Sequence, residues 1–182
     1  NLLDSLGNPN ETNVPLTFYD NFTDIVKYNF VHTMNNMGNP DTMIIDPVLK
    51  YRVIAHTIPP VESEVITILP GEHTVIPLKT PQGKLKITIK TKEDYQFIVK
   101  QSNKKETINV QRINNSQSYL TGFYDIELLT LPRQYFKNIR INQNQLTQLQ
   151  LPSTGLANIL LPANGYGGVY LKDGDKLTEI YK

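Results

Sequence analysis

The sequence of 182 residues contains no cysteine and no tryptophan. Without cysteine, the chain cannot form a disulfide bond, a thiolate nucleophile or a cysteine-ligated zinc site. No stretch approaches the roughly 20 consecutive apolar residues that a membrane-spanning helix requires. The formal net charge is only +1 at pH 7, whereas binding to a phosphate backbone usually requires a clustered basic excess. We therefore expect no membrane span in this segment and no nucleic-acid partner.

Helical periodicity is also missing from the sequence. The one helix-compatible stretch, residues 1–6, is expected to be a loosely held terminus. Elsewhere apolar and polar residues alternate, as where Leu85, Ile87 and Ile89 are separated by lysine and threonine. Alternation of this kind places one face of a strand on a core and the other in water, which is typical of antiparallel sheets. The chain is therefore predicted to be all-β.

One block of sequence occurs twice. Tyr51-Arg52-Val53 leads to Thr57-Ile58-Pro59. Tyr124-Asp125-Ile126 leads in the same way to Thr130-Leu131-Pro132, at an offset of 73 residues from the first block. Apolar alternation continues at this offset beyond the proline, so we interpret the two blocks as copies of one repeat.

The residues upstream of each block match less closely. Residues 27–31 resemble residues 94–98 at an offset of 67, and the difference predicts a longer loop in the first copy around residues 34–46. A third start follows at residues 155–159 and stops about halfway through a unit.

These matches define a domain organisation. We predict an N-terminal extension (1–13), two β-sandwich repeats (14–79 and 83–152) and an incomplete third repeat (155–182). Units of about 70 residues with short alternating strands fit small immunoglobulin-like sandwiches. The short joints contain proline and glycine, which favours restricted motion between repeats. An incomplete sandwich also leaves a strand edge exposed, which suggests a fragment of a larger exported protein.

The order of these motifs resembles a known family. An alternating strand, a Thr-x-Pro motif, a Pro-Gly turn and a second alternating strand resemble PEGA-type and carboxypeptidase-regulatory-like sandwich repeats of bacterial envelope proteins. More narrowly, residues 56–62, 70–73 and 80–83 are similar to the C-terminal β-repeat region of secreted bacterial von Willebrand factor A proteins. The resemblance implies a periplasmic or cell-surface location. The Asp-x-Ser-x-Ser loop of the von Willebrand A domain is absent, so the metal chemistry of that domain is not implied here.

Three histidines, His32, His56 and His73, raise the possibility of a metal site, because zinc sites can be formed where three such side chains converge. A His-Thr pair on a strand is more often a half-exposed position. The second repeat has Lys100 and Leu129 where the first has two of these histidines, so the repeat itself does not require them. We expect neither a metal nor another cofactor.

Catalytic motifs are not found. No Gly-x-Ser-x-Gly elbow occurs. The acidic residues Asp41, Asp46, Glu62 and Glu64 lie around predicted turns, where carboxylates are usually solvated. Asp173-Gly174-Asp175 lacks the further ligands of a calcium loop and fits a hairpin tip better. We therefore predict that the chain is not an enzyme.

Two groups of residues are candidates for interactions. Pro81, Gln82 and Gly83 form a joint between repeats, equivalent to residues 153–155. This joint is either a recognition loop or a turn that uses the conformational freedom of glycine. The second group is a tyrosine-rich face that could stack on sugars, although glycan-binding modules usually also present tryptophan; its members are Tyr95, Tyr119, Tyr166 and Tyr170.

These observations favour a non-catalytic structural or interaction module of a secreted or envelope bacterial protein. Such a module would space or support a neighbouring domain, for example a von Willebrand A domain. Its partners would be other domains of the same polypeptide or other envelope proteins. The alternative is a β-sandwich module that binds a glycan or a peptide.

Overall fold

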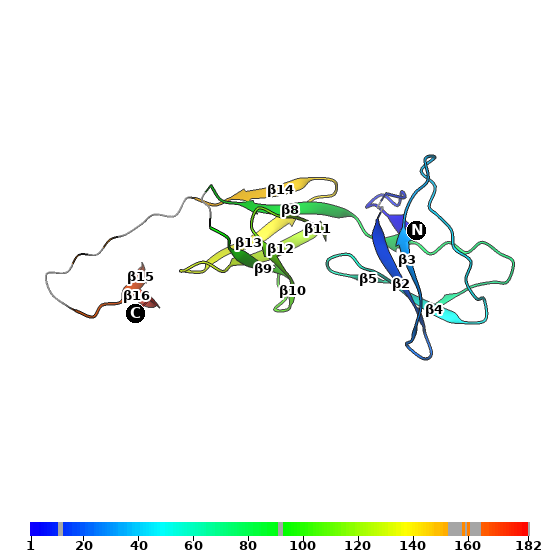
Figure 1. Cartoon of the computed structure of the whole chain (residues 1–182), viewed down its shortest axis with the longest axis horizontal. Coiled ribbons are helices and arrows are strands. Elements are labelled where there is room, and N and C mark those ends of the chain that lie inside the picture. Colours follow the sequence, from blue (N-terminus) through cyan, green and yellow to red (C-terminus); the bar gives the residue numbers. More distant parts are fainter. Residues whose placement is uncertain (11–12, 91–92, 153–157, 159, 161–164, 182) are drawn as a thin grey trace. The chain divides into compact units, whose positions relative to one another are not determined.

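The computed structural model describes residues 1–10, 13–90, 93–152, 158, 160 and 165–181. These residues contain strands and no helix (Figure 1), which confirms the all-β prediction. Because this part of the chain has no helix, it has none long and apolar enough to cross a membrane. The chain divides into two compact units. Unit 1 comprises Asn1–Leu85, Ser116–Phe123 and Arg140–Thr147, and unit 2 comprises Lys86–Asn115, Tyr124–Ile139 and Gln148–Lys182.

The strands are short, and most belong to small antiparallel sheets, as expected for tandem small β-domains. In chain order they are β1 (Leu2–Leu3), β2 (Val14–Asp20), β3 (Val26–His32), β4 (Lys50–Ala55), β5 (Val61–Glu62), β6 (Ile66–Thr67), β7 (Leu78–Lys79), β8 (Gln82–Thr88), β9 (Gln96–Gln101), β10 (Thr107–Arg112), β11 (Ser116–Leu120), β12 (Gly122–Leu128), β13 (Gln134–Ile141), β14 (Leu146–Gln150), β15 (Val169–Asp173) and β16 (Lys176–Tyr181).

The main sheet of unit 1 has the order β3-β2-β4-β5, and β6 also pairs with β4. Alternation in β2 and β4 directs Leu16, Phe18, Tyr51 and Val53 into the core, where each is at most 5% exposed. The Phe18 and Tyr51 rings meet edge to face with their centroids 6.3 Å apart, a geometry that aromatic quadrupoles favour. Both rings also contact Tyr28 of β3.

The first residues of the chain are firmly held, so the expectation of a loose terminus was wrong. Leu2 is fully buried, and β1 pairs in parallel with β7. The carboxylate of Asp4 accepts hydrogen bonds from the amides of Leu6 and Asn8, each at 2.8 Å. Residues 1–3 stay in place because their backbone completes a ladder and an apolar side chain enters the core of unit 1.

The second repeat contributes two sheets, with the orders β10-β9-β12-β13 and β11-β8-β14. If β8 is counted as strand A, these orders are C-B-E-F and D-A-G. Constant-type immunoglobulin domains instead group strands A, B, E and D in one sheet and C, F and G in the other. The strand order therefore differs from that of a constant-type immunoglobulin domain, whereas the all-β class agrees with the prediction.

The 73-residue offset marks the same local structure twice. Tyr51 in β4 and Tyr124 in β12 are 0% and 1% exposed. After each strand, a threonine hydroxyl donates a hydrogen bond to a proline carbonyl: Thr57 Oγ1 to Pro59 O at 2.6 Å, and Thr130 Oγ1 to Pro132 O at 2.7 Å. The peptide bond preceding each proline is cis. The extents of the repeats along the chain, 14–79 and 83–152, stay a prediction.

The upstream match at an offset of 67 residues was wrong. The strand that pairs with β4 is β2, whereas the strand that pairs with β12 is β9. The counterpart of β9 is therefore β2, and the counterpart of β10 is β3. The error arose because neighbouring strands of one sheet share the same alternating pattern, so a short Tyr-x-Phe match does not distinguish them.

The predicted long loop of the first repeat does contain more irregular chain. Between β3 and β4, residues 33–49 include no strand, only an isolated bridge between Met34 and Pro40. The corresponding connection in the second repeat, between β10 and β12, includes β11. The first repeat therefore lacks a strand that the second repeat has.

Much of the predicted start of the third repeat, at residues 155–157 and 159, lies outside the described residues. The last strands, β15 and β16, form a hairpin in which Asp173 pairs with Lys176. Gly174 has a φ of 58° and holds the first central position of the turn, as a type II′ turn requires. This confirms the hairpin tip predicted for residues 173–175.

Candidate functional site

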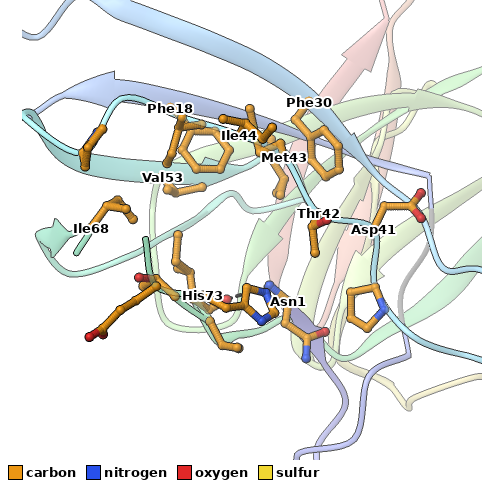
Figure 2. Close-up of a pocket in the computed structure, with 18 of the residues that line it drawn as sticks. Asn1, Phe18, Phe30, Asp41, Thr42, Met43, Ile44, Val53, Ile68 and His73 are labelled. Atoms are coloured by element: carbon orange, nitrogen blue, oxygen red, sulfur yellow. Dashed lines mark hydrogen bonds between the residues drawn. The ribbon is translucent and has the colours of Figure 1, made fainter. Parts of the chain in front are cut away.

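Unit 1 contains a cavity of about 550 Å³. One wall is the inner face of the main sheet, with Phe18, Phe30 and Val53 (Figure 2). The other walls are residues 40–47 and 68–76. Concave, largely apolar pockets of roughly 300–1,000 Å³ are typical of sites for small molecules. This pocket is therefore a candidate site for a small molecule.

The two irregular walls resemble strands that have found no partner. Met43 and Ile45 are partly buried against the core, whereas Ile44 between them is fully exposed. This alternation is that of an extended strand. Within the described residues, the backbone of residues 43–45 and of residues 73–75 makes no hydrogen bond. The walls therefore direct apolar side chains toward the core without closing a sheet over it.

The charged side chains that line the pocket are two exposed carboxylates, Asp41 and Glu72. The Asp41 carboxylate accepts a hydrogen bond from the hydroxyl of Thr33. The amine of Asn1 donates to the carbonyl oxygen of Ile76 at 2.6 Å, and burial lowers its pKa. The described lining includes neither lysine nor arginine, so its side-chain charge is negative.

The structure brings two of the three histidines to this pocket. His32 is buried in β3, with its Nε2 atom 3.4 Å from the backbone nitrogen of Leu2. His73 lies on the exposed wall. His56 is not part of the lining; its Nε2 atom lies 2.7 Å from Thr17 Oγ1. Among the described residues no three histidine or acidic side chains are grouped as metal ligands would be.

Two of the three joint residues lie in a strand. Gln82 and Gly83 belong to β8, and Pro81 O accepts the amide of Thr121 at 2.8 Å. Gly83 is buried, and a Cβ atom there would lie 2.0 Å from the carbonyl oxygen of Asn142. Glycine is therefore required by the close approach of another backbone, and the expected turn conformation was wrong. The equivalent joint, residues 153–155, lies outside the described residues.

One of the four tyrosines of the proposed interaction face is not at the surface. Tyr119 in β11 is fully buried and cannot contact a ligand from solvent. Tyr95 is half-buried, whereas Tyr166 and Tyr170 are exposed. Alternation along β11 turns Tyr119 inward, a direction that composition alone does not reveal.

Polar contacts elsewhere connect strands or turns. Arg52 in β4 forms ion pairs with Glu62 and Asp24. The Asp125 carboxylate accepts the amide of Asn138 at 2.9 Å and the hydroxyl of Ser102 at 2.7 Å. These bonds lower the pKa of Asp125, and the backbone bond has the largest effect. Such contacts stabilise ionised carboxylates on strands and do not create a reactive group.

Sequence reasoning missed the pocket because it lies between segments interpreted as loop and turn. The available signal was the alternation of Met43 and Ile45 with exposed residues inside the predicted loop. An apolar alternating segment with no partner strand indicates a sheet face that its own repeat leaves incompletely covered.

Comparisons with known proteins give little further guidance. No family model matches the chain, and no curated protein matches it. Among solved structures it is similar to "The Bacillus anthracis TIE protein", with a TM-score of 0.34 and 13% sequence identity. That match covers 83% of this chain and 33% of the other, so this chain spans about a third of its length. At this TM-score the similarity supports no argument about function.

Proposed function

We propose that this chain is a non-catalytic structural module that supports or spaces neighbouring parts of a secreted or envelope bacterial protein. One observation carries the proposal: the two repeats keep the residues that build a β-domain. Tyr51 and Tyr124 are buried in corresponding strands, and Thr57 and Thr130 make the same hydrogen bond to a proline carbonyl.

The histidines of the first repeat are not matched by histidines at the equivalent positions of the second repeat. At the 73-residue offset, His56 corresponds to Leu129 and His73 to Leu146. His32 lies opposite Val14 across the β2–β3 ladder. The equivalent position of the second repeat, opposite Tyr95, is held by Ile113. A module whose copies share core residues but not histidines fits a role in construction better than a repeated active site.

The resemblance to envelope repeats supports an extracytoplasmic location and a neighbouring domain, such as a von Willebrand A domain, as partner. Within this proposal, the partners are other domains of the same polypeptide or other envelope proteins.

Replacement in the full-length protein tests the supporting role. Residues 14–152 would be exchanged for an unrelated pair of β-domains of equal length, and surface display and activity of the rest of the protein would be measured. A supporting module predicts that the exchange preserves both. If only the native sequence restores them, its role is specific recognition and the proposal fails.

A further inference from the structure

We propose that the pocket of unit 1 binds a small amphipathic cation, a molecule with an apolar body and one positively charged end. This inference concerns ligand binding and does not depend on the supporting role. It rests on the shape of the pocket, its apolar walls and the sign of the charge at its lining.

The first repeat leaves open some apolar surface that the second repeat buries at equivalent positions. In the second repeat Phe97, Ile126 and Ile141 are at most 1% exposed. Their counterparts in the first repeat are Leu16, Val53 and Ile68, which all line the cavity. Ile68 is only partly buried, so the first repeat leaves apolar surface in contact with solvent. Covering that surface with an apolar molecule is favourable because water is released from it.

The charged side chains of the described lining are both acidic. Asp41 and Glu72 are its only charged side chains among the described residues. A cation placed near them is attracted, and an anion of the same shape is repelled. The amine of Asn1 also lies in the lining, where it donates to the carbonyl oxygen of Ile76, and burial lowers its pKa and so disfavours its charged form. An anionic group also lies apart from the apolar wall: Asp41 lies away from Phe18 and Val53 (Figure 2). A ligand with one apolar end and one charged end matches this separation.

Backbone groups provide further contacts. The amides and carbonyls of residues 43–45 and 73–75 are free of hydrogen bonds within the described structure. The carbonyl oxygens can accept the N–H groups of an ammonium, and the amides can donate to neighbouring acceptor atoms of a ligand.

Titration with matched probes tests the proposal. Octylammonium and octanoate have the same alkyl chain and opposite charge, and each would be titrated into the complete chain below its micelle concentration, followed by calorimetry and NMR. Octylammonium is expected to bind about fivefold more tightly, a modest factor because exposed carboxylates are screened by solvent. The double variant Asp41→Asn, Glu72→Gln should abolish that preference. The control Glu64→Gln, Glu179→Gln removes two exposed acids outside the lining and should preserve it.

A second pair of variants tests the location. Val75→Trp adds bulk to a lining residue that is 58% exposed, and Val65→Trp adds the same bulk at a 53% exposed residue outside the lining. Val75→Trp should reduce octylammonium binding at least about tenfold, whereas Val65→Trp should leave it unchanged. Thermal melts of both variants confirm that they are folded. Equal binding of the two probes, no binding of either, or binding that Val75→Trp does not affect would each overturn the proposal.

Discussion

The first and second repeats bury the same tyrosine and make the same threonine-to-proline hydrogen bond, but they bury other equivalent positions to different extents. In the second repeat, β13 spans eight residues, and Ile141 at its end is 1% exposed. In the first repeat, the corresponding residues 61–68 form two short strands, β5 (Val61–Glu62) and β6 (Ile66–Thr67), and Ile68 is partly buried. The same local sequence therefore leads to a covered apolar position in one copy and to a pocket wall in the other.

The difference separates the part of the repeat that forms in both copies from the part that forms in only one. The block from the tyrosine strand to the proline forms in both copies because its core residues alternate strictly and its strand pairs with the equivalent strand of its own repeat. Its threonine-to-proline hydrogen bond spans only two residues. Coverage of the opposite side depends on longer connections, and these differ between the copies. Four sets of variants test this difference between the repeats, from the largest expected effect to the smallest.

Removal of the shared tyrosine should have the largest effect. Tyr124→Ala is expected to cost about 4 kcal/mol of unfolding free energy and Tyr51→Ala about 3 kcal/mol, because partly exposed neighbours in the first repeat can move into the space. Chemical denaturation followed by NMR signals from each repeat measures both. Tyr51→Phe, which keeps the ring and removes the hydroxyl with its 2.7 Å hydrogen bond to Asp46 O, should cost about 1 kcal/mol. A larger loss at position 51 than at 124 would contradict the more open core of the first repeat.

A methyl group at Gly83 should have the next largest effect. Gly83→Ala places a Cβ atom against the backbone of Asn142, and the strand must shift, at a cost of about 2 kcal/mol. Gly167 has no neighbouring heavy atom within 4 Å of a built Cβ atom, so Gly167→Ala is the matched control with little expected effect. Equal melting temperatures for the two variants would show that the close approach is not important for stability.

The shared hydrogen bond should contribute about equally in the two copies. Thr57→Val and Thr130→Val each remove a hydroxyl donor, and each is expected to cost about 1 kcal/mol, with the larger loss at the more buried Thr57. Denaturation midpoints measure both values. If one variant is neutral and the other is not, the two motifs are not energetically equivalent.

The smallest effect concerns pH. The amide of Asn138 and the hydroxyl of Ser102 hold the pKa of Asp125 below its usual value of 3.8. The folded chain therefore binds this proton less readily than the unfolded chain. The resulting stabilisation is present above about pH 4 and is lost as the pH falls through the lower native pKa. Asp125→Asn should flatten the dependence of unfolding free energy on pH in that acidic range. Asp173→Asn, at the exposed end of β15, is the control, and an unchanged curve for Asp125→Asn would refute the prediction.

The sequence predicted the all-β class, the 73-residue repeat and the hairpin tip, because these depend on alternation and on local turn residues. It did not predict the burial of Leu2, because pairing of β1 with β7 joins residues more than 70 positions apart. The sequence predicted that Gly83 is needed for a turn conformation. The actual requirement is the close approach of the Asn142 backbone, a tertiary contact that the sequence does not reveal. The pocket was missed for the same reason: whether Met43 and Ile45 are covered depends on which strands form nearby.

Residue-resolved amide hydrogen exchange tests most directly whether the first repeat leaves one side of its core open. The account predicts that the amides of residues 43–45 and 73–75 exchange almost as fast as in an unstructured peptide. Amides within β12 and β13 should exchange at least about a hundredfold more slowly, because their ladders must open first. Equal protection of these two groups of amides would mean that both repeats are closed, and it would contradict the account.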